Sequence, residues 1–107
     1  MKRRILPDET DWIESAVKNV SSKELILMDN GGFKMVRLAP YASYPEHSHP
    51  DKTEYAYVLA GNPDIKIGPE LFSTNPDEFY IFPKNEKHAI MNNSDMESIL
   101  LIGAIKS

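Results

Sequence analysis

Turn-forming residues interrupt this chain about every ten residues from Lys23 onward, and this spacing limits the folds open to it. Asp29–Gly32 contains an Asn-Gly pair, which favours a two-residue hairpin turn because both turn positions need positive φ. Gly61–Pro63 and Gly68–Pro69 end two further apolar segments. Short segments separated by such turns are typical of an all-β sandwich or barrel.

The segments between the turns predict eight short strands and no long helix. The strands are Leu25–Met28, Phe33–Leu38, Glu54–Leu59, Asp64–Ile67, Leu71–Ser73, Glu78–Phe82, His88–Met91 and Glu97–Ile105. The best helical candidate, Thr10–Val17, is short enough to form only a turn. We therefore expect an all-β fold, a small antiparallel β-barrel of jelly-roll topology, because closure removes exposed strand edges.

The length of 107 residues supports one domain, residues 1–107, in which residues 1–22 form an N-terminal lead-in. The chain has no cysteine, which excludes disulfides, thiolate metal ligands and cysteine nucleophiles. Its net charge of −4 provides no basic stripe for phosphates, so we expect no nucleic-acid partner.

No apolar stretch approaches the roughly 20 residues that span a bilayer. The longest, Ile99–Ile105, predicts a buried terminal strand. Lys2–Arg4 is not followed by the apolar segment of a signal peptide. We therefore expect no membrane partner and a cytoplasmic location.

All three histidines of the chain fall into two short clusters. His47 and His49 are followed by Glu54, and His88 lies in a later apolar segment. Imidazole nitrogens and a carboxylate suit one divalent transition metal ion, namely Fe, Mn, Ni, Cu or Zn. The sequence therefore predicts a metal site. Taken alone, His47 and His49 would fit a polar loop, Glu54 a solvated edge carboxylate and His88 a buried core histidine.

The two-residue period of a strand predicts which side chains share a face. His47 and His49 point the same way if the chain is extended there. If Glu54 faces inward with them, Tyr55 and Tyr57 face outward. Four ligands on a six-coordinate metal leave two positions for water, O₂ or substrate, and an open site of this kind is typical of catalysis or ligand binding.

Two segments resemble the two motifs of the cupin superfamily. Residues 41–61 contain His47-x-His49-x4-Glu54-x6-Gly61, and residues 77–92 contain Pro83-x-Asn85-x2-His88-x3-Asn92. The resemblance implies that His47, His49, Glu54 and His88 are metal ligands, and that the fold is a small jelly-roll barrel. It also implies a homodimer and a small-molecule ligand or substrate.

The chain departs from the family pattern at three glycine positions, occupied here by Tyr41, Asp77 and Asn85. Asp and Asn tolerate positive φ, so Asp77 and Asn85 can replace glycine in a turn. Tyr41 adopts positive φ only at a cost, so we expect a reshaped turn there, or position 42 in its place. Asn92 is interpreted as a turn former rather than a site residue.

Several other side chains are candidates for the wall of a substrate pocket, although core packing is the better interpretation for each. They are Phe33, Met35, Phe79, Ile81, Ile90 and Ile102. Arg37 and Tyr80 have polar ends that can orient an anionic ligand.

Three functions remain open at this point. A metal-dependent enzyme, such as a dioxygenase or isomerase, would polarise a small oxygenated substrate. A non-catalytic module would use the metal to bind a sugar or carboxylate without turnover. A structural or interaction protein would keep the metal residues as a vestige. In an enzyme, a Glu54 detached from the metal can serve as a general base.

Overall fold

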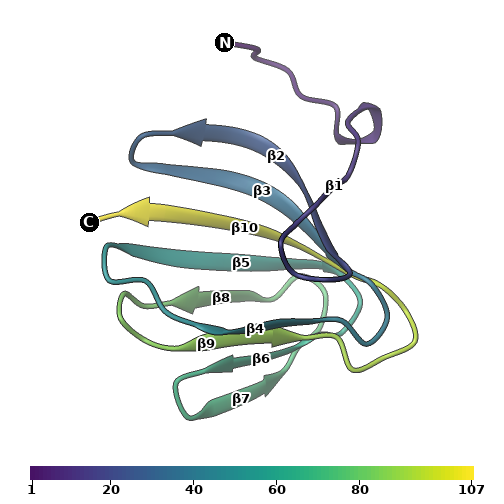
Figure 1. Cartoon of the computed structure of the whole chain (residues 1–107), viewed down its shortest axis with the longest axis vertical. Helices are drawn as coiled ribbons and strands as arrows, with labels where there is room; N and C mark the ends of the chain where they lie inside the picture. The colour runs from purple at the N-terminus through teal and green to yellow at the C-terminus, as the bar shows by residue number, and fades with distance from the viewer.

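The computed structural model describes residues 1–107 as two antiparallel β-sheets packed against each other (Figure 1). The six-stranded sheet has the order β1 (Ile13–Glu14), β2 (Val20–Met28), β3 (Gly31–Leu38), β10 (Ser98–Lys106), β5 (Lys52–Ala60) and β8 (Phe79–Phe82). The four-stranded sheet has the order β4 (Ser43–His47), β9 (His88–Met91), β6 (Asp64–Ile67) and β7 (Glu70–Ser73). The only helical segment is η1, a 3₁₀ turn at Pro7–Glu9, and no helix has the length to cross a membrane. The all-β class is confirmed.

The predicted closure into a barrel is wrong, because no strand of one sheet pairs with a strand of the other. Strands β1 and β8 are the edges of the larger sheet, and β4 and β7 are the edges of the smaller. Pro45 lies within β4 and Pro83 directly follows β8, and proline has no N–H to donate to a further strand. The fold is an open sandwich that fits a jelly roll.

Two segments at the sheet edges differ from the sequence expectations. The helical candidate Thr10–Val17 forms no helix, because Ile13 pairs with Ser22 in a short β-ladder. Ladder hydrogen bonds here outweigh a weak helical periodicity. Strand β4 was not expected, because Pro45 within it and Pro50 after it favour a loop.

The β2–β3 hairpin predicted at Asp29–Gly32 is confirmed, but its turn lies one residue earlier. Met28 pairs with Gly31, so Asp29 and Asn30 form the turn, and neither has positive φ. Gly31 is instead required within β3, because a Cβ there would collide with the carbonyl oxygen of Ala104 in β10.

The core lies between the two sheets, and side chains of both sheets contribute to it. Its buried members are Val20, Val36, Leu38, Ala42, Ala56, Val58, Ile65, Phe82, Ile90 and Leu100. Strand β5 shows the predicted alternation, since Ala56 and Val58 are fully buried while Tyr55 and Tyr57 lie on the outer face. Glu54 shares the inward face with Ala56.

Positive φ occurs at all three positions where the family pattern has glycine. Asp77 has a φ of 73° and Asn85 a φ of 70°, as expected. The expectation for Tyr41 is wrong, because this residue itself adopts a φ of 60°. Its N–H donates to the carbonyl oxygen of Ser94 at 3.1 Å, and its exposed ring projects away from the core. The backbone hydrogen bond holds the turn despite the strained conformation.

Asn92 joins the β3–β4 and β9–β10 loops from a fully buried position. Its side-chain amide donates to the carbonyl oxygens of Leu38, Ala39 and Met96, at 3.2, 3.0 and 2.7 Å. Its Oδ1 accepts from the hydroxyl of Ser94 at 3.0 Å. These contacts confirm Asn92 as a turn former.

Candidate metal centre

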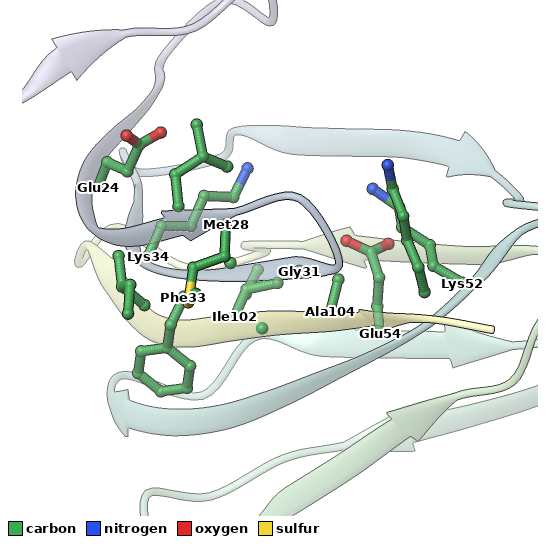
Figure 2. Close-up of a pocket in the computed structure, with 14 residues that line it drawn as sticks. Glu24, Met28, Gly31, Phe33, Lys34, Lys52, Glu54, Ile102 and Ala104 are labelled. Atoms are coloured by element: carbon green, nitrogen blue, oxygen red, sulfur yellow. The ribbon is translucent and has the colours of Figure 1, made fainter.

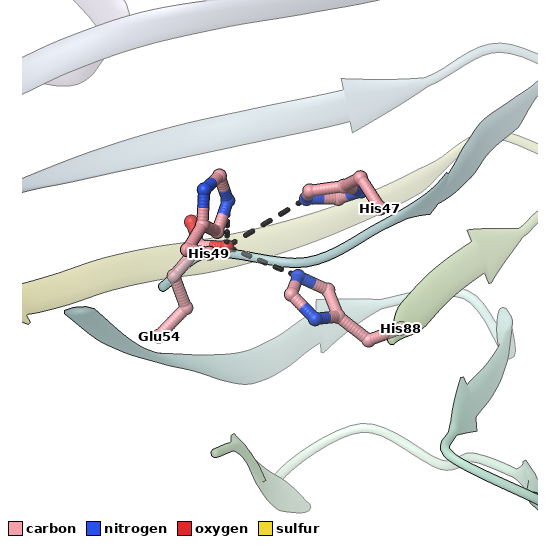
Figure 3. A group of neighbouring side chains, drawn as sticks. All are labelled: His47, His49, Glu54 and His88. Carbon is pink, nitrogen blue, oxygen red and sulfur yellow. Dashed lines mark hydrogen bonds and ion pairs between the residues drawn. The ribbon is translucent and has the colours of Figure 1, made fainter. Parts of the chain in front are cut away.

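The structure brings the four predicted ligands together, and we call His47, His49, Glu54 and His88 the ligand cluster (Figure 3). His47 ends β4 and pairs with His88 at the start of β9. His49 lies in the loop after β4, and Glu54 faces inward from β5 in the other sheet. Both sheets therefore contribute to the cluster, while metal binding by these residues stays a prediction.

The geometry of the ligand cluster suits one small cation. Glu54 Oε1 lies 2.9 Å from His49 Nε2, 3.0 Å from His88 Nε2 and 3.7 Å from His47 Nε2. The four ligand atoms all lie within 4.8 Å of one another. Atoms bound at about 2.1 Å to one metal lie roughly 3 to 4 Å apart, so modest side-chain adjustment would complete the coordination.

Two of the histidines have tautomers fixed by their Nδ1 contacts. His47 Nδ1 lies 2.9 Å from the carbonyl oxygen of Pro45, and His88 Nδ1 lies 3.2 Å from that of Glu86. Because a carbonyl oxygen only accepts, Nδ1 carries a proton, so a ring without a second proton directs its Nε2 lone pair inward. Lone pairs and a carboxylate oxygen facing one point repel each other unless a proton or a metal ion lies between them.

Electrostatics favour the ligand form of both Glu54 and His49. Burial acts to raise the pKa of Glu54, but the hydrogen bond with His88 and the charges of His49 and Lys52 outweigh it and lower this pKa. Burial is the largest cause that lowers the pKa of His49, with Lys52 and the other two imidazoles adding to it against the attraction of Glu54. A metal ion needs this combination of an ionised carboxylate and a neutral imidazole.

The ring of His88 is held rigidly against the core. It stacks on Phe82 with ring centroids 4.4 Å apart and an interplanar angle of 4°, and the residue is only 2% exposed. The backbone contact at Nδ1 fixes the ring's rotation as well. His88 is thus preorganised, with its Nε2 directed at Glu54.

Two cavities adjoin the ligand cluster. A small one of about 60 Å³ is lined by His47, Glu54 and His88 together with apolar core residues. A larger one of about 270 Å³ lies under the β2–β3 hairpin and contacts the cluster only through Glu54 (Figure 2). Lys34, Glu54 and Ile102 line both cavities. A small molecule can therefore reach the cluster from this side of the sandwich.

Tyr44 is a site residue that the sequence argument did not find. It lines the small cavity, and its ring lies 4.9 Å from that of His47. Burial, followed by the charge of Glu54, raises the pKa of its hydroxyl, which therefore stays protonated. The available signal was its position inside the first motif segment, on the strand that carries His47.

The other candidates for the pocket wall separate into inner and outer residues. Ile90 and Ile102 line the small cavity, whereas Phe33 borders the larger one but directs its ring to the outer face, against Tyr55. Phe79 and Ile81 are 54% and 55% exposed, so neither core packing nor a pocket role applies to them. They lie on the outer face of the six-stranded sheet, as does Met35.

The two polar candidates also lie away from the cavities. Arg37 covers the ring of Trp12, with its guanidinium carbon 4.4 Å from the ring centroid. The hydroxyl of Tyr80 donates to Glu78 at 2.7 Å. Neither residue lines the cavities beside the ligand cluster, so the suggested role in orienting an anionic ligand is not supported.

Comparison with known families identifies the fold that carries this cluster. Residues 34–102 match the family described as the cupin domain. The chain belongs to the cupin family. This match confirms the resemblance carried by the two histidine motifs.

Curated relatives match most of this chain. A putative germin-like protein 3-2 from Oryza sativa subsp. japonica is 30% identical over 105 residues, covering 92% of this chain and 47% of that protein. The chain spans about half the length of the curated relatives it matches.

Two solved cupin structures have closely similar folds. A predicted oxalate decarboxylase from Thermotoga maritima has a TM-score of 0.90 at 18% identity, covering 97% of this chain and 99% of that chain. A sugar phosphate isomerase of the cupin superfamily from Silicibacter pomeroyi has a TM-score of 0.86 at 20% identity, covering 97% of this chain and 76% of that one. At these identities the likeness concerns the fold alone.

Proposed function

We propose that this cupin binds one divalent transition metal through the ligand cluster and acts as a metal-dependent enzyme on a small oxygenated molecule. The observation that carries the proposal is the convergence of three imidazole Nε2 atoms and one carboxylate oxygen beside a cavity. Four protein ligands leave coordination positions free in an octahedral ion, and catalytic metal sites keep such positions open.

A metal bound here would act as a Lewis acid toward an oxygen atom of the substrate. The chain's own residues have separate tasks. His88, whose ring stacks on Phe82, would provide one metal ligand in a fixed orientation. The Tyr44 hydroxyl has no hydrogen-bond partner within the protein and stays protonated, so it can donate to an oxygen of the bound molecule. Val20, Val36 and Ile90 exclude water from the inner wall.

Dioxygenase-like and isomerase-like reactions both fit an open site of this kind. The similar folds include a sugar phosphate isomerase and a predicted oxalate decarboxylase, which illustrates how much chemistry this scaffold supports. The ion that the protein retains will direct the choice, because iron favours oxygenation whereas Mn, Ni or Zn favours Lewis-acid chemistry.

The decisive experiment is mass-spectrometric metal analysis of the purified protein. We expect close to one metal ion per chain in the parent and its loss in His47→Ala and His88→Ala. A matched pair tests the carboxylate: Glu54→Gln should lose metal, whereas Glu46→Gln, whose carboxylate lies 3.6 Å from Lys66, should keep it. A parent that binds no metal after reconstitution with Fe, Mn, Ni and Zn would overturn the proposal.

The partner we propose is a second copy of the chain, docked on the outer face of the six-stranded sheet. Phe33, Tyr55 and Phe79 form an aromatic row there, with successive ring centroids 6.3 and 5.7 Å apart, and Phe79 and Ile81 are more than half exposed. Apolar surface of this kind is typical of an interface.

Light scattering after size-exclusion chromatography tests the dimer. We expect a dimeric parent, and a monomer for Ile81→Asp because a charge on the outer face would be buried at the interface. The control Leu71→Asp changes an equally exposed apolar residue on β7 of the other sheet and should stay dimeric. A monomeric parent would contradict this assignment.

A further inference from the structure

Three lysines face the larger cavity from the inner side of the six-stranded sheet. Lys34 lies opposite Ile102 in the β3–β10 ladder, and Lys52 lies opposite Lys106 in the β5–β10 ladder. Lys34 shares its face with the buried Val36 by the two-residue period. Figure 2 shows Lys34 on one side of this cavity and Lys52 near Glu54 on the other.

None of these three lysines has a carboxylate within 4.0 Å. The only such pair formed by a lysine or arginine joins Lys66 to Glu46, at 3.6 Å and in the other sheet. Glu24 is the partner of Lys34 in the β2–β3 register, yet the two side chains form no ion pair. Free positive charges therefore line one side of a protein whose net charge is −4.

Lys34 has the most informative position of the three. It lines both the larger cavity and the small cavity that contains the ligand cluster, a property shared only with Glu54 and Ile102. A molecule that contacts a metal at the cluster and extends into the larger cavity therefore passes Lys34. Two carboxylates, Glu24 and Glu54, also line the larger cavity, but its three lysines outnumber them, so the charge on its walls is positive overall.

We propose that Lys34 selects small organic dianions, binding the second carboxylate of a molecule whose first carboxylate occupies the metal. This inference rests on the proposed metal function and names its substrate class. Lysine suits the task because its ammonium group is a compact charge with three rotatable donors on a flexible stem. A volume of about 270 Å³ limits the ligand to a small acid. Lys52 and Lys106 add to the positive potential that draws the acid inward.

Calorimetric titration of the zinc-loaded protein with succinate, glutarate and the length-matched monoanion succinamate, in which an amide replaces the second carboxylate, tests this selectivity. We expect the parent to prefer succinate or glutarate over succinamate by about tenfold or more, the usual effect of a charge-assisted hydrogen bond. Lys34→Met should lose most of this preference, and Lys34→Arg should restore most of it. Lys18→Met, which removes one charge from an exposed turn that lines neither cavity, should behave as the parent.

The outcomes separate this inference from the proposed function. Zinc content is measured for each variant, and the titrations are repeated on metal-free protein. A parent without zinc defeats the metal function, while a Lys34-dependent preference for dianions in metal-free protein would still support the lysine. Equal binding of succinate and succinamate, or an unchanged preference in Lys34→Met, would overturn the inference. Loss of zinc in Lys34→Met would also overturn it, because Lys34 would then act on the metal centre.

Discussion

Protons compete with a metal ion for the nitrogens of the ligand cluster, so metal affinity should depend on pH. Histidine has an ordinary pKa of 6.5, and burial shifts the pKa of His49 below this value. A lower pKa means that protons displace the metal from His49 only at lower pH. Glu54, whose pKa is also lowered, stays ionised throughout the same range.

Zinc affinity, measured against a chromophoric chelator, should be nearly constant between about pH 8 and 7 and fall steeply below about pH 6. The steepness arises because several imidazoles must lose their protons together. Affinity that stays constant down to about pH 5 would contradict histidine ligation.

Tyr41 offers a prediction about stability rather than binding. Its positive φ costs about 1 to 2 kcal/mol, and glycine at this position removes that strain while adding roughly 0.5 to 1 kcal/mol of backbone entropy to the unfolded chain. Its exposed ring makes few contacts that would be lost. Tyr41→Gly should therefore raise the free energy of unfolding by up to about 1 kcal/mol in urea titrations.

Asn85→Gly is the matched control, because its φ of 70° is similar and asparagine tolerates it. It should change stability by less than Tyr41→Gly does. A destabilised Tyr41→Gly variant would show that the tyrosine ring contributes more than its exposure indicates.

Three members of the ligand cluster could be predicted from local spacing, and His88 from its own motif in a separate segment. His47, His49 and Glu54 lie within one short segment, and strand periodicity fixes the side on which they point. Lys34 and Tyr44 could not be found in this way. Lys34 and Glu54 line the same cavities only because β3, β10 and β5 are neighbours in the sheet. No local sequence pattern predicts which strands pair.

At the level of elements, the sequence predicts the strands that carry apolar alternation and end at turn residues. Strand β4 is an exception, because Pro45 argues against a strand. The proline is tolerated here because β4 is an edge strand that pairs only with β9. The helical periodicity of Thr10–Val17 misleads for a different reason. Ile13 and Glu14 pair with β2, and Trp12 packs against the charged ends of Lys23 and Arg37, contacts that no local pattern encodes.

Strand β10 depends on a glycine that faces an aromatic ring. Gly103 lies opposite Tyr55, and a Cβ at this position would lie 2.5 Å from the tyrosine Cζ. Phe33 and Phe79 flank the same ring, so it has little freedom to move away. Gly103→Ala should therefore lower the free energy of unfolding by about 1 to 3 kcal/mol, as overpacking does.

A double-mutant cycle tests the cause of that loss. Adding Gly103→Ala to a Tyr55→Ala background should cost less than it does in the parent, because the ring that the new methyl group meets is gone. Costs that simply add would place the strain in the backbone of β10 and contradict the steric account.

For the whole molecule, local sequence could not predict whether the strands close into a barrel or form two separate sheets. Eight short strands are compatible with a barrel and with two separate sheets, and the difference lies in how the edge strands meet. Here the smaller sheet provides His47 and His88 while the larger provides Glu54. With no ladder hydrogen bonds between the sheets, a metal ion bound by these residues would be a direct bond between them.

Metal binding should therefore stabilise the whole fold. A ligand that binds only the folded state adds about 2.7 kcal/mol at a concentration 100 times its Kd. For a chain of this size the melting temperature should rise on the order of 10 °C. Thermal unfolding of the parent is followed with and without zinc, using His47→Ala and His88→Ala under the same zinc excess as controls. Because each control lacks a bond from the smaller sheet, zinc should raise its melting temperature far less, and an equal rise in all three proteins would mean that zinc binds elsewhere.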